Sequence, residues 1–294
     1  MTPWTDLGGG VLVRQSAVFW MNSALLLDPG HAVLVDPGVL PSELEDLADA
    51  VRAAGPRTVS IVFTHSHWDH VLGRPWWPAA ATVGHARLAA ELRRDAGAIL
   101  AEASGHAARA GETWDRGFQA FAPDLVVEDE RSLALGPWRL VPREAPGHCD
   151  SQISAHLPDR RLLLAGDLLS DLEIPWLDRE PAAYRRTLER IGMLAGAGEI
   201  ETLVPGHGAI ARGRTAVLER LHRDLGYLDS LVAEVRAARE AGLALEEAQA
   251  RLAALDYPGK GAADPMDDVH RENVRIAWQR MEPGLPPLHS SEPW

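Results

Sequence analysis

The sequence predicts an α/β fold that is followed by a helical C-terminal segment. Over residues 1–213, short apolar runs typical of strands alternate with segments of helical periodicity. A strand, a helix and a further strand in succession over residues 32–63 indicate a βαβ unit with parallel strands. Residues 214–294 carry helical patterns only. We therefore divide the chain into an α/β domain, residues 1–213, and a helical extension, residues 214–294.

The first predicted strands include a hairpin. Ala24–Leu27 and Ala32–Val35 are apolar runs, and the residues between them, Asp28-Pro29-Gly30-His31, favour a turn. An earlier apolar run, Val11–Val13, predicts one more strand before this hairpin.

A helix is predicted between Asp36-Pro37-Gly38 and Gly55-Pro56. Its apolar residues recur with spacings of three and four, and Ser42 and Glu45 have the spacing of a capping box. The run Val59–Phe63 predicts a buried strand directly after it. The alternation continues with helices at 86–110 and 182–194, strand character at 133–141, 153–164 (broken by a turn at 158–160) and 202–204.

The helical extension begins with a long amphipathic helix. Leucine and valine recur with spacings of three and four from Leu218 to Val235, which predicts one apolar stripe. The stripe either packs on the α/β domain or pairs with a second copy, giving a homodimer through the C-terminal helices. Two shorter helices are predicted near 245–255 and 267–281.

Charge and composition argue against several functional classes. The formal net charge of −13 repels polyanions, so we expect no nucleic-acid partner. No apolar run reaches the roughly 20 residues that span a bilayer, so we expect no membrane association. The N-terminal residues lack a secretory pattern, and a single cysteine, Cys149, fits a reducing compartment. These features predict a cytoplasmic protein.

A cluster of metal-binding side chains follows the predicted strand at 59–63. His65 and His67 are two residues apart on an extended segment, so their rings point to the same side. A turn after them lets Asp69 and His70 face the same space. Any one of these histidines alone would more often be a capping or core residue. Four ligand-type side chains within six residues favour a site for two adjacent cations, such as zinc or another divalent first-row metal.

Three later residues share one local context. His148, Asp167 and His207 each follow a strand-like run and a glycine, which lets the backbone approach a crowded site. Loops at strand ends gather at one edge of a sheet, where α/β active sites lie. The candidate metal ligands are therefore His65, His67, Asp69, His70, His148, Asp167 and His207.

In their order along the chain, these motifs resemble the metallo-β-lactamase superfamily of hydrolases over about residues 8–213. The resemblance implies a four-layer αββα sandwich with two metals at one edge of the paired sheets. The helical extension is similar to that of hydroxyacylglutathione hydrolases, where it covers or flanks the pocket. By this resemblance, His65, His67 and His148 hold the first metal, Asp69, His70 and His207 hold the second, Asp167 bridges them, and Asp36 is a buried acid that orients the ligand loops.

Two neighbouring dications lower the pKa of a bridging water towards neutrality. The predicted function is a dinuclear metal-dependent hydrolase whose metal-bridging hydroxide attacks the thioester, ester or lactone carbonyl of a small-molecule acyl substrate. Asp69, which orients the hydroxide, and the bridging Asp167 are the predicted catalytic residues. The cofactors are two divalent ions, zinc in the first place, with iron or manganese as alternatives.

Several other functions share this ligand framework. An iron-dependent persulfide dioxygenase is one alternative. A phosphodiesterase or nuclease is another, which the net charge disfavours. Lactam hydrolysis stays open as a side activity. In a non-catalytic alternative, the metals only stabilise a redox or interaction partner.

Aromatic side chains and the last helix are candidates for the substrate pocket. Trp20, Trp68 and Trp176 lie in segments that flank the candidate ligands, although core packing is the simpler expectation for each one singly. His270 and Asn273 are three residues apart on the last predicted helix and share a face, which makes them candidates to reach the pocket, although a helix docked only for stability is the simpler expectation. Cys149 stands where family members often carry a hydroxyl residue; we expect a small buried side chain there, with a redox-sensitive thiol or a metal ligand as alternatives.

Overall fold

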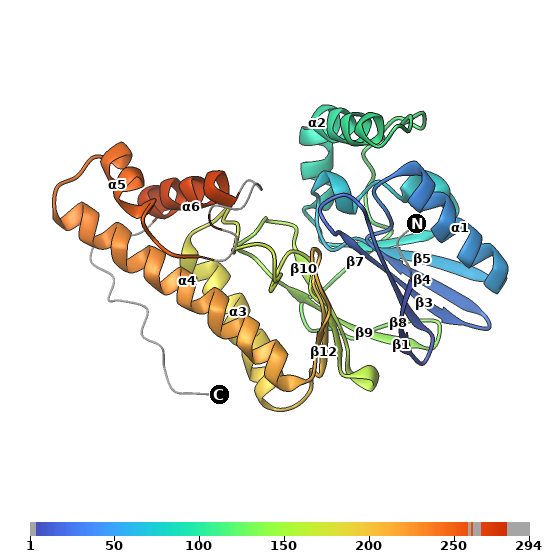
Figure 1. The fold of residues 1–294 in the computed structure, drawn as a ribbon. Coiled ribbons are helices and arrows are strands. Elements are labelled where there is room, and N and C mark those ends of the chain that lie inside the picture. Colours follow the sequence, from blue (N-terminus) through green and yellow to red (C-terminus); the bar gives the residue numbers. More distant parts are fainter. Residues whose placement is uncertain (1–3, 258–259, 261–265, 281–294) are drawn as a thin grey trace.

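Two β-sheets lie face to face in the computed structural model, which describes residues 4–257, 260 and 266–280 (Figure 1). The first sheet has the order β1 (Trp4–Gly8), β2 (Val11–Gln15), β3 (Asn22–Asp28), β4 (His31–Val35), β5 (Thr58–Val62), β6 (Ala81–Gly84) and β7 (Leu125–Val126). The second sheet has the order β13 (Ala211–Arg212), β12 (Thr202–Val204), β11 (Leu162–Leu164), β10 (Ile153–Leu157), β9 (Trp138–Glu144) and β8 (Leu133–Leu135).

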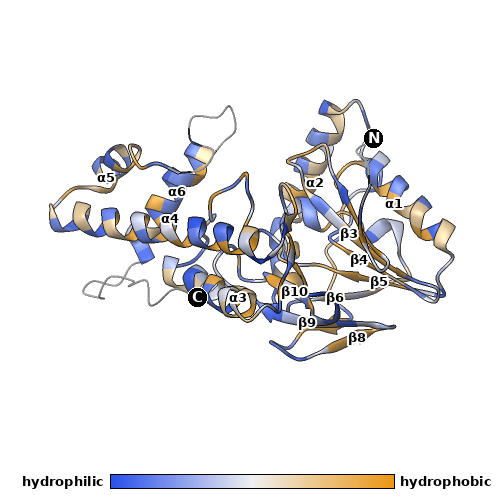
Figure 2. Cartoon of the chain, turned by 60° about the horizontal axis from the view of Figure 1, so that its bottom comes forward, coloured by the Kyte–Doolittle hydropathy of each residue, from blue (hydrophilic) through white to orange (hydrophobic). Residues whose placement is uncertain are grey.

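The inner faces of the two sheets form one aliphatic core. Val13, Leu26 and Val62 of the first sheet belong to the same buried cluster as Leu140 and Leu164 of the second. Alternation along the strands sends every second side chain to this core. Hydrophobic residues accordingly recur along the strands of the sandwich, as Figure 2 shows.

Helices cover both outer faces and complete the four layers. α1 (Pro41–Ala54) and α2 (Leu88–Arg109) cover the first sheet, where Leu47 and Leu92 pack with Ile61 in a second cluster. α3 (Pro181–Gly196) and α4 (Arg214–Glu240) cover the second sheet, and α5 (Leu245–Leu252) and α6 (Met266–Arg280) pack on α4. The predicted four-layer αββα fold with C-terminal helices is confirmed.

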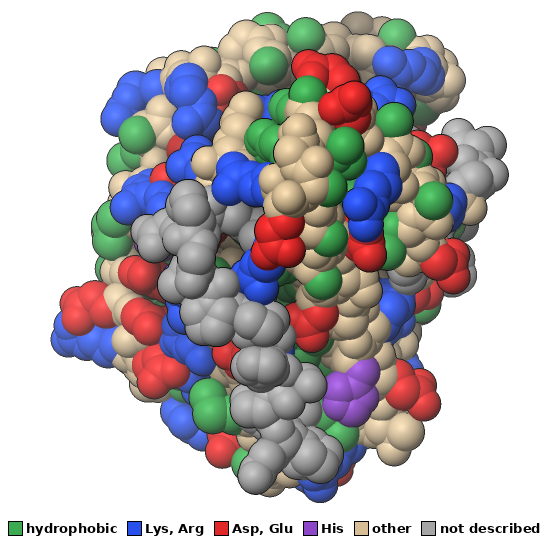
Figure 3. Space-filling view, turned by 90° about the vertical axis from the view of Figure 1, so that its left-hand side faces the viewer, with side chains coloured by type: hydrophobic (Ala, Val, Ile, Leu, Met, Phe, Trp, Pro, Cys, Tyr) green, Lys and Arg blue, Asp and Glu red, His purple; other side chains and the backbone are tan. Residues whose placement is uncertain are grey.

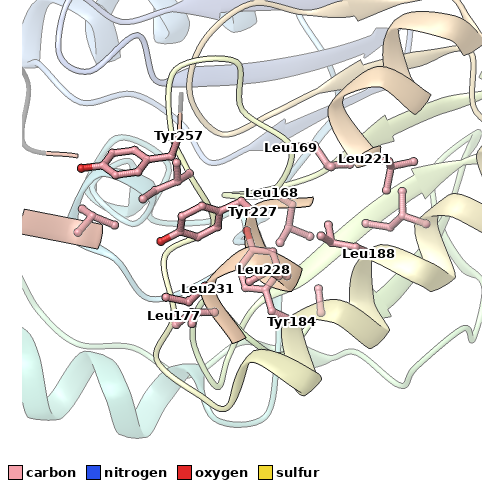
Figure 4. Close-up of a cluster of buried hydrophobic side chains, with 14 of the residues drawn as sticks. Leu168, Leu169, Leu177, Tyr184, Leu188, Leu221, Tyr227, Leu228, Leu231 and Tyr257 are labelled. Carbon is pink, nitrogen blue, oxygen red and sulfur yellow. The ribbon is translucent and has the colours of Figure 1, made fainter. Parts of the chain in front are cut away.

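The long helix α4 is held by a third cluster, which includes Leu221, Leu228 and Val235 of the predicted apolar stripe, with Leu218 and Leu225 partly buried against it. Figure 4 shows Leu221, Leu228 and Leu231 of this helix among Tyr184 and Leu188 of α3. Because the stripe is buried within the chain, a homodimer would need another surface of the C-terminal helices. On the end of the molecule shown in Figure 3, hydrophobic side chains are separated by acidic and basic ones.

Most predicted elements are confirmed, and the differences have local causes. The strands at Val11–Val13, Ala24–Leu27 and Ala32–Val35 correspond to β2, β3 and β4. The Ser42–Glu45 capping box was a wrong prediction. The helix begins two residues earlier, at Pro41 with Leu40 as its N-cap, and the Glu43 carboxylate accepts the Leu40 N–H instead.

Four strands were not predicted. β7 and β13 have two residues each, β6 has four, and β1 carries polar residues. Their formation depends on pairing with neighbouring strands rather than on their own pattern. Among the described residues, none of the helices is long and apolar enough to cross a lipid bilayer.

Candidate metal centre

Four loops bring the predicted metal ligands together at one edge of the sandwich. The segment His65–His70 follows β5, and His148 lies between β9 and β10. Asp167 follows β11, and His207 follows β12. β11 and β12 are parallel, as are β4 and β5, so their carboxyl ends lie at the same edge. The sequence-predicted convergence of these seven side chains is therefore seen in the structure.

The first group of ligand atoms consists of three imidazole nitrogens around one carboxylate oxygen. His67 Nδ1 lies 2.9 Å from His148 Nε2, which lies 3.3 Å from Asp167 Oδ2. His65 Nε2 lies 3.4 Å from the same oxygen. These four side chains form one of the clusters that can hold a metal ion.

The second group uses the other oxygen of Asp167. His70 Nε2 lies 3.1 Å from Asp167 Oδ1, and His207 Nε2 lies 3.5 Å from it. His207 Nε2 is also 3.3 Å from Asp69 Oδ2. The Asp167 carboxylate thus faces one group with each of its oxygens, as a bridge between two ions requires.

The histidine rings present lone pairs to both groups. The Nδ1–H groups of His70, His148 and His207 donate to Asp36, to the Trp176 carbonyl and to the Phe19 carbonyl, respectively. Since each acceptor can only accept, Nδ1 of each ring carries a proton, and Nε2 is the nitrogen left to bind a metal. His70 Nε2 and His207 Nε2 lie 3.4 Å apart. A metal ion between them would take the lone pairs of both nitrogens.

Distances and unsatisfied atoms fit a metal as well. A tetrahedral zinc ion with bonds of about 2.0–2.1 Å sets its ligand atoms about 3.3 Å apart, the spacing seen in both groups. His65 Nε2 and Asp167 Oδ1 are buried and have no hydrogen-bond partner among the described residues. Buried polar atoms are normally satisfied, so these two atoms call for a ligand.

The pKa values of the histidines shift in opposite directions in the two groups. Burial lowers the pKa of His65 to about 3, and burial together with His148 lowers the pKa of His67, so both rings are neutral ligands. For His207, the carboxylates of Asp167 and Glu173 outweigh burial and raise its pKa to about 10. This negative potential attracts positive charge, which a bound dication supplies.

Asp36 connects both groups through hydrogen bonds. It follows β4 with a φ of +47°, in the left-handed region, and is buried. Its Oδ1 accepts the Thr64 N–H at 2.7 Å, and its Oδ2 accepts the His70 Nδ1–H at 2.9 Å and the Thr64 hydroxyl. The Thr64 oxygen in turn accepts the His65 Nδ1–H at 3.0 Å. One carboxylate therefore orients one histidine of each group.

Gly206 shows why a glycine precedes His207. A Cβ atom at this position would overlap the Asp167 carboxylate and lie 3.1 Å from the ring of His70. Only glycine allows the backbone this close to both ligands.

The two groups lie at the base of a cavity of about 570 Å³. His67, Asp69, Asp167 and His207 are exposed to it. The remaining walls come from the Phe19–Trp20 loop, from helices α2 and α6, and from the segment 172–176.

The candidate ligands fall within a stretch that matches a known protein family. A sequence model of the Metallo-beta-lactamase superfamily matches residues 18–207. The chain belongs to the metallo-β-lactamase superfamily. Its ligand groups, its fold and its helical C-terminal segment agree with this assignment.

Relatives within the metallo-β-lactamase superfamily include hydrolases. The chain is 32% identical over 197 residues to the acyl-coenzyme A thioesterase MBLAC2 of Bos taurus. The matched region covers 62% of this chain and 68% of the relative. It is 25% identical over 158 residues to a hydroxyacylglutathione hydrolase of Francisella tularensis subsp. novicida (strain U112), covering 54% of this chain and 51% of the relative. The predicted metal-dependent hydrolase is confirmed at this level.

A solved structure shows the same fold. The stereoselective inverting sec-alkylsulfatase Pisa1 from Pseudomonas sp. superimposes with a TM-score of 0.70 at 15% identity, over 95% of this chain and 50% of that chain. This chain therefore spans half the length of the alkylsulfatase, and the likeness concerns the fold alone.

Beyond the metal ligands, all three predicted pocket tryptophans line the cavity. Trp20 is 51% exposed and Trp176 is 47% exposed, whereas Trp68 stacks on His106 at 4.8 Å. Most of the remaining wall was not predicted from the sequence. The sequence of α2 did contain a pattern for part of this wall. Spacings of four, three and four put Asp95, Ile99, Glu102 and His106 on one face of the helix. Glu173, Met266, Val269 and Glu272 had no comparable signal and line the cavity as well.

His270 and Asn273 do not line the cavity, which corrects the prediction that they reach it. Both are buried, with His270 bonded to the Tyr227 hydroxyl at 2.9 Å and to the Leu252 carbonyl at 3.0 Å. Met266, Val269 and Glu272 lie on the face of α6 that borders the cavity, and His270 and Asn273 lie on the neighbouring face, towards α4.

Asn273 still acts on the site, through the segment that carries Trp176. Its side-chain amide donates to the Pro175 carbonyl at 2.6 Å and accepts the Leu177 N–H at 2.8 Å. Trp176 lies between these two bonded residues, and its carbonyl accepts the Nδ1–H of His148 at 3.2 Å. The C-terminal helix α6 thereby positions a candidate metal ligand.

Replacing Asn273 by alanine is expected to weaken metal binding by roughly 10-fold or more, since partners that orient metal-binding histidines have effects of this size. Titration of the metal-free protein with zinc measures it. Gln249→Ala is the matched control, because this amide also bonds α6, at the Arg271 carbonyl, but lies away from Trp176. A lower melting temperature with unchanged metal affinity would show that Asn273 only stabilises the fold.

Cys149 is buried and bonded to the Ser151 hydroxyl at 3.6 Å. Burial raises the pKa of its thiol to about 12, so the thiolate that metal binding or oxidation requires is disfavoured. Among the described residues it belongs to none of the metal-binding clusters. These observations fit a small buried side chain.

Proposed function

We propose that this protein hydrolyses small acyl thioesters, esters or lactones at a dinuclear zinc centre. The observation that carries the proposal is the Asp167 carboxylate, whose two oxygens face two separate groups of ligand atoms at the base of an open cavity. His65, His67 and His148 would hold one ion, and Asp69, His70 and His207 the other. Two bound dications supply a nucleophile derived from water at neutral pH and polarise the substrate carbonyl.

The protein side chains have distinct roles in this proposal. Asp69 lines the cavity and would orient the attacking water through the carboxylate oxygen that is not held by a metal. Asp36 and the carbonyls of Phe19 and Trp176 keep the histidine rings in one orientation, so that little reorganisation accompanies the reaction.

The apolar part of the cavity supports an acyl substrate. Ala98, Ile99 and Leu172 line it together with Met266 and Val269 of α6. The name of the mammalian relatives, acyl-coenzyme A thioesterase, points to the same bond type. We propose the thioester as the first substrate class to test. We also propose that the protein acts in the cytoplasm.

Metal removal tests the proposal. Treatment with a chelator is expected to abolish turnover of a panel of thioesters, aryl esters and lactones, and two equivalents of zinc per chain should restore it. The melting temperature should rise again with the metal, because a ligand that binds only the folded state stabilises it. Oxygen consumption with glutathione persulfide and one iron per chain, without acyl hydrolysis, would instead establish a dioxygenase. Cleavage of bis-p-nitrophenyl phosphate alone would establish a phosphodiesterase.

A further inference from the structure

Apart from the histidines, the titratable residues that line the cavity are all acidic. Among the described lining residues there is no lysine or arginine, and the residues outside the described ranges contain neither residue type in their sequence. The acidic lining residues are Asp69, Asp95, Glu102, Asp167, Glu173, Asp268 and Glu272.

Arginines neutralise three of these acids from positions that do not line the cavity. Arg94 bonds both carboxylate oxygens of Asp95, at 2.9 and 2.7 Å, Arg271 bonds Asp268 at 3.1 Å, and Arg275 bonds Glu272. Asp69 and Asp167 belong to the metal groups. Of the acidic lining residues, Glu102 and Glu173 therefore have neither an arginine partner nor a place among the metal ligands.

Among the described residues, no lysine or arginine forms an ion pair with either of these two carboxylates. The Glu102 carboxylate lies 3.7 Å from His106, whose pKa is lowered by burial and by Arg109 despite Glu102 and Asp69. In the part of the chain that the structure describes, the Glu173 carboxylate has no hydrogen-bond or ion-pair partner.

Exposed aromatic side chains line the same cavity as these carboxylates. Phe19, Trp20 and Trp176 line the same cavity and leave large parts of their surface open. Phe19 and Trp20 both have positive φ angles, 52° and 50°, a strained conformation for such residues. The loop is held there because the Phe19 carbonyl accepts from His207 and the Trp20 carbonyl accepts the Gly208 N–H at 3.0 Å.

Open aromatic faces and unpaired carboxylates together form a surface that binds ammonium groups, through cation–π attraction and charge. We infer that the cavity selects acyl substrates that carry a positively charged nitrogen, bound among Trp20, Trp176 and Glu173. This inference rests on the proposed acyl hydrolysis and narrows it. It also separates this chain from the activity named for MBLAC2, since a coenzyme A thioester would bring several phosphate charges to a cavity without lysine or arginine.

Three thioesters of similar reactivity and different charge provide the test. S-Acetylthiocholine is cationic, S-(3,3-dimethylbutyl) thioacetate is its neutral isostere, and acetyl-coenzyme A is anionic. With zinc-loaded protein and thiol release as the readout, kcat/KM should be at least roughly 10-fold higher for the cation than for the isostere, an effect of the size of one desolvated cation–π contact. It should be lowest for acetyl-coenzyme A, and the advantage of the cation should shrink as salt is added.

Variants locate the selectivity. Glu173→Gln and Trp20→Leu should each lower the ratio of cation to isostere several-fold, whereas Glu128→Gln, at an exposed glutamate paired with Arg131, should leave the ratio unchanged. Equal or faster turnover of the neutral or anionic thioester by the wild-type protein would overturn the inference while leaving acyl hydrolysis intact. Failure to hydrolyse any of the three, or any other acyl substrate, would overturn the proposed function and the inference with it.

Discussion

Asp167→Ala is expected to lose at least one of the two metals and to lower kcat/KM by at least about 1,000-fold, or about 4 kcal/mol of transition-state stabilisation. The reason is that both groups of ligand atoms use this carboxylate, with His65 at 3.4 Å from Oδ2 and His70 at 3.1 Å from Oδ1. Metal content per chain and hydrolysis of a thioester measure the two effects on the same sample.

Asp159→Ala is the matched control for this variant. Asp159 precedes strand β11, which Asp167 follows, and it pairs with Arg139 at the surface. It should keep both metals and full activity. Normal metal content and rate in Asp167→Ala would remove Asp167 from the centre.

Asp36→Asn is expected to lower metal affinity and activity by roughly 10- to 100-fold, the range seen when partners of metal-bound histidines are removed. The amide nitrogen of asparagine cannot accept, so either the bonds to His70 and the Thr64 hydroxyl or the bond to the Thr64 N–H must be lost. Because the Thr64 hydroxyl also holds His65, both metals should be affected.

The sequence contains its own control for Asp36. Asp28-Pro29-Gly30 repeats the tripeptide Asp36-Pro37-Gly38 at the opposite end of β4, and Asp28 accepts only a local N–H, from Gly30. Asp28→Asn should therefore leave metal affinity unchanged. If zinc titrations of the two variants agree, Asp36 does not organise the ligands.

Much of the fold was predictable because its core elements carry their own pattern. Apolar runs revealed β2, β3 and β4, and the stripe from Leu218 to Val235 revealed α4. The two-residue strands β7 and β13 could not be predicted, since they exist only through pairing with a neighbour. The start of α1 was misjudged because Glu43 and Glu45 both suit a helical first turn, and tertiary contacts decide between them.

The convergence of the ligand groups was predictable for a related reason. Ligands at the carboxyl ends of neighbouring strands must meet at one edge, so His65, Asp167 and His207 were found from strand and glycine patterns. The spacing in α2 shows which residues share a face, but it could not show that this face and α6 line the cavity. A spacing of three residues shows that His270 and Asn273 share a face, but only the packing of α6 on α4 decides where that face points.

We propose that seven side chains of this protein hold two adjacent metal ions. Anomalous X-ray diffraction from crystals of the zinc-loaded protein tests it most directly. We expect two peaks per chain, one within bonding distance of His65, His67 and His148 and the other within bonding distance of Asp69, His70 and His207, with Asp167 between them. A fully loaded, active protein with a single peak, or with peaks outside these side chains, would contradict the account.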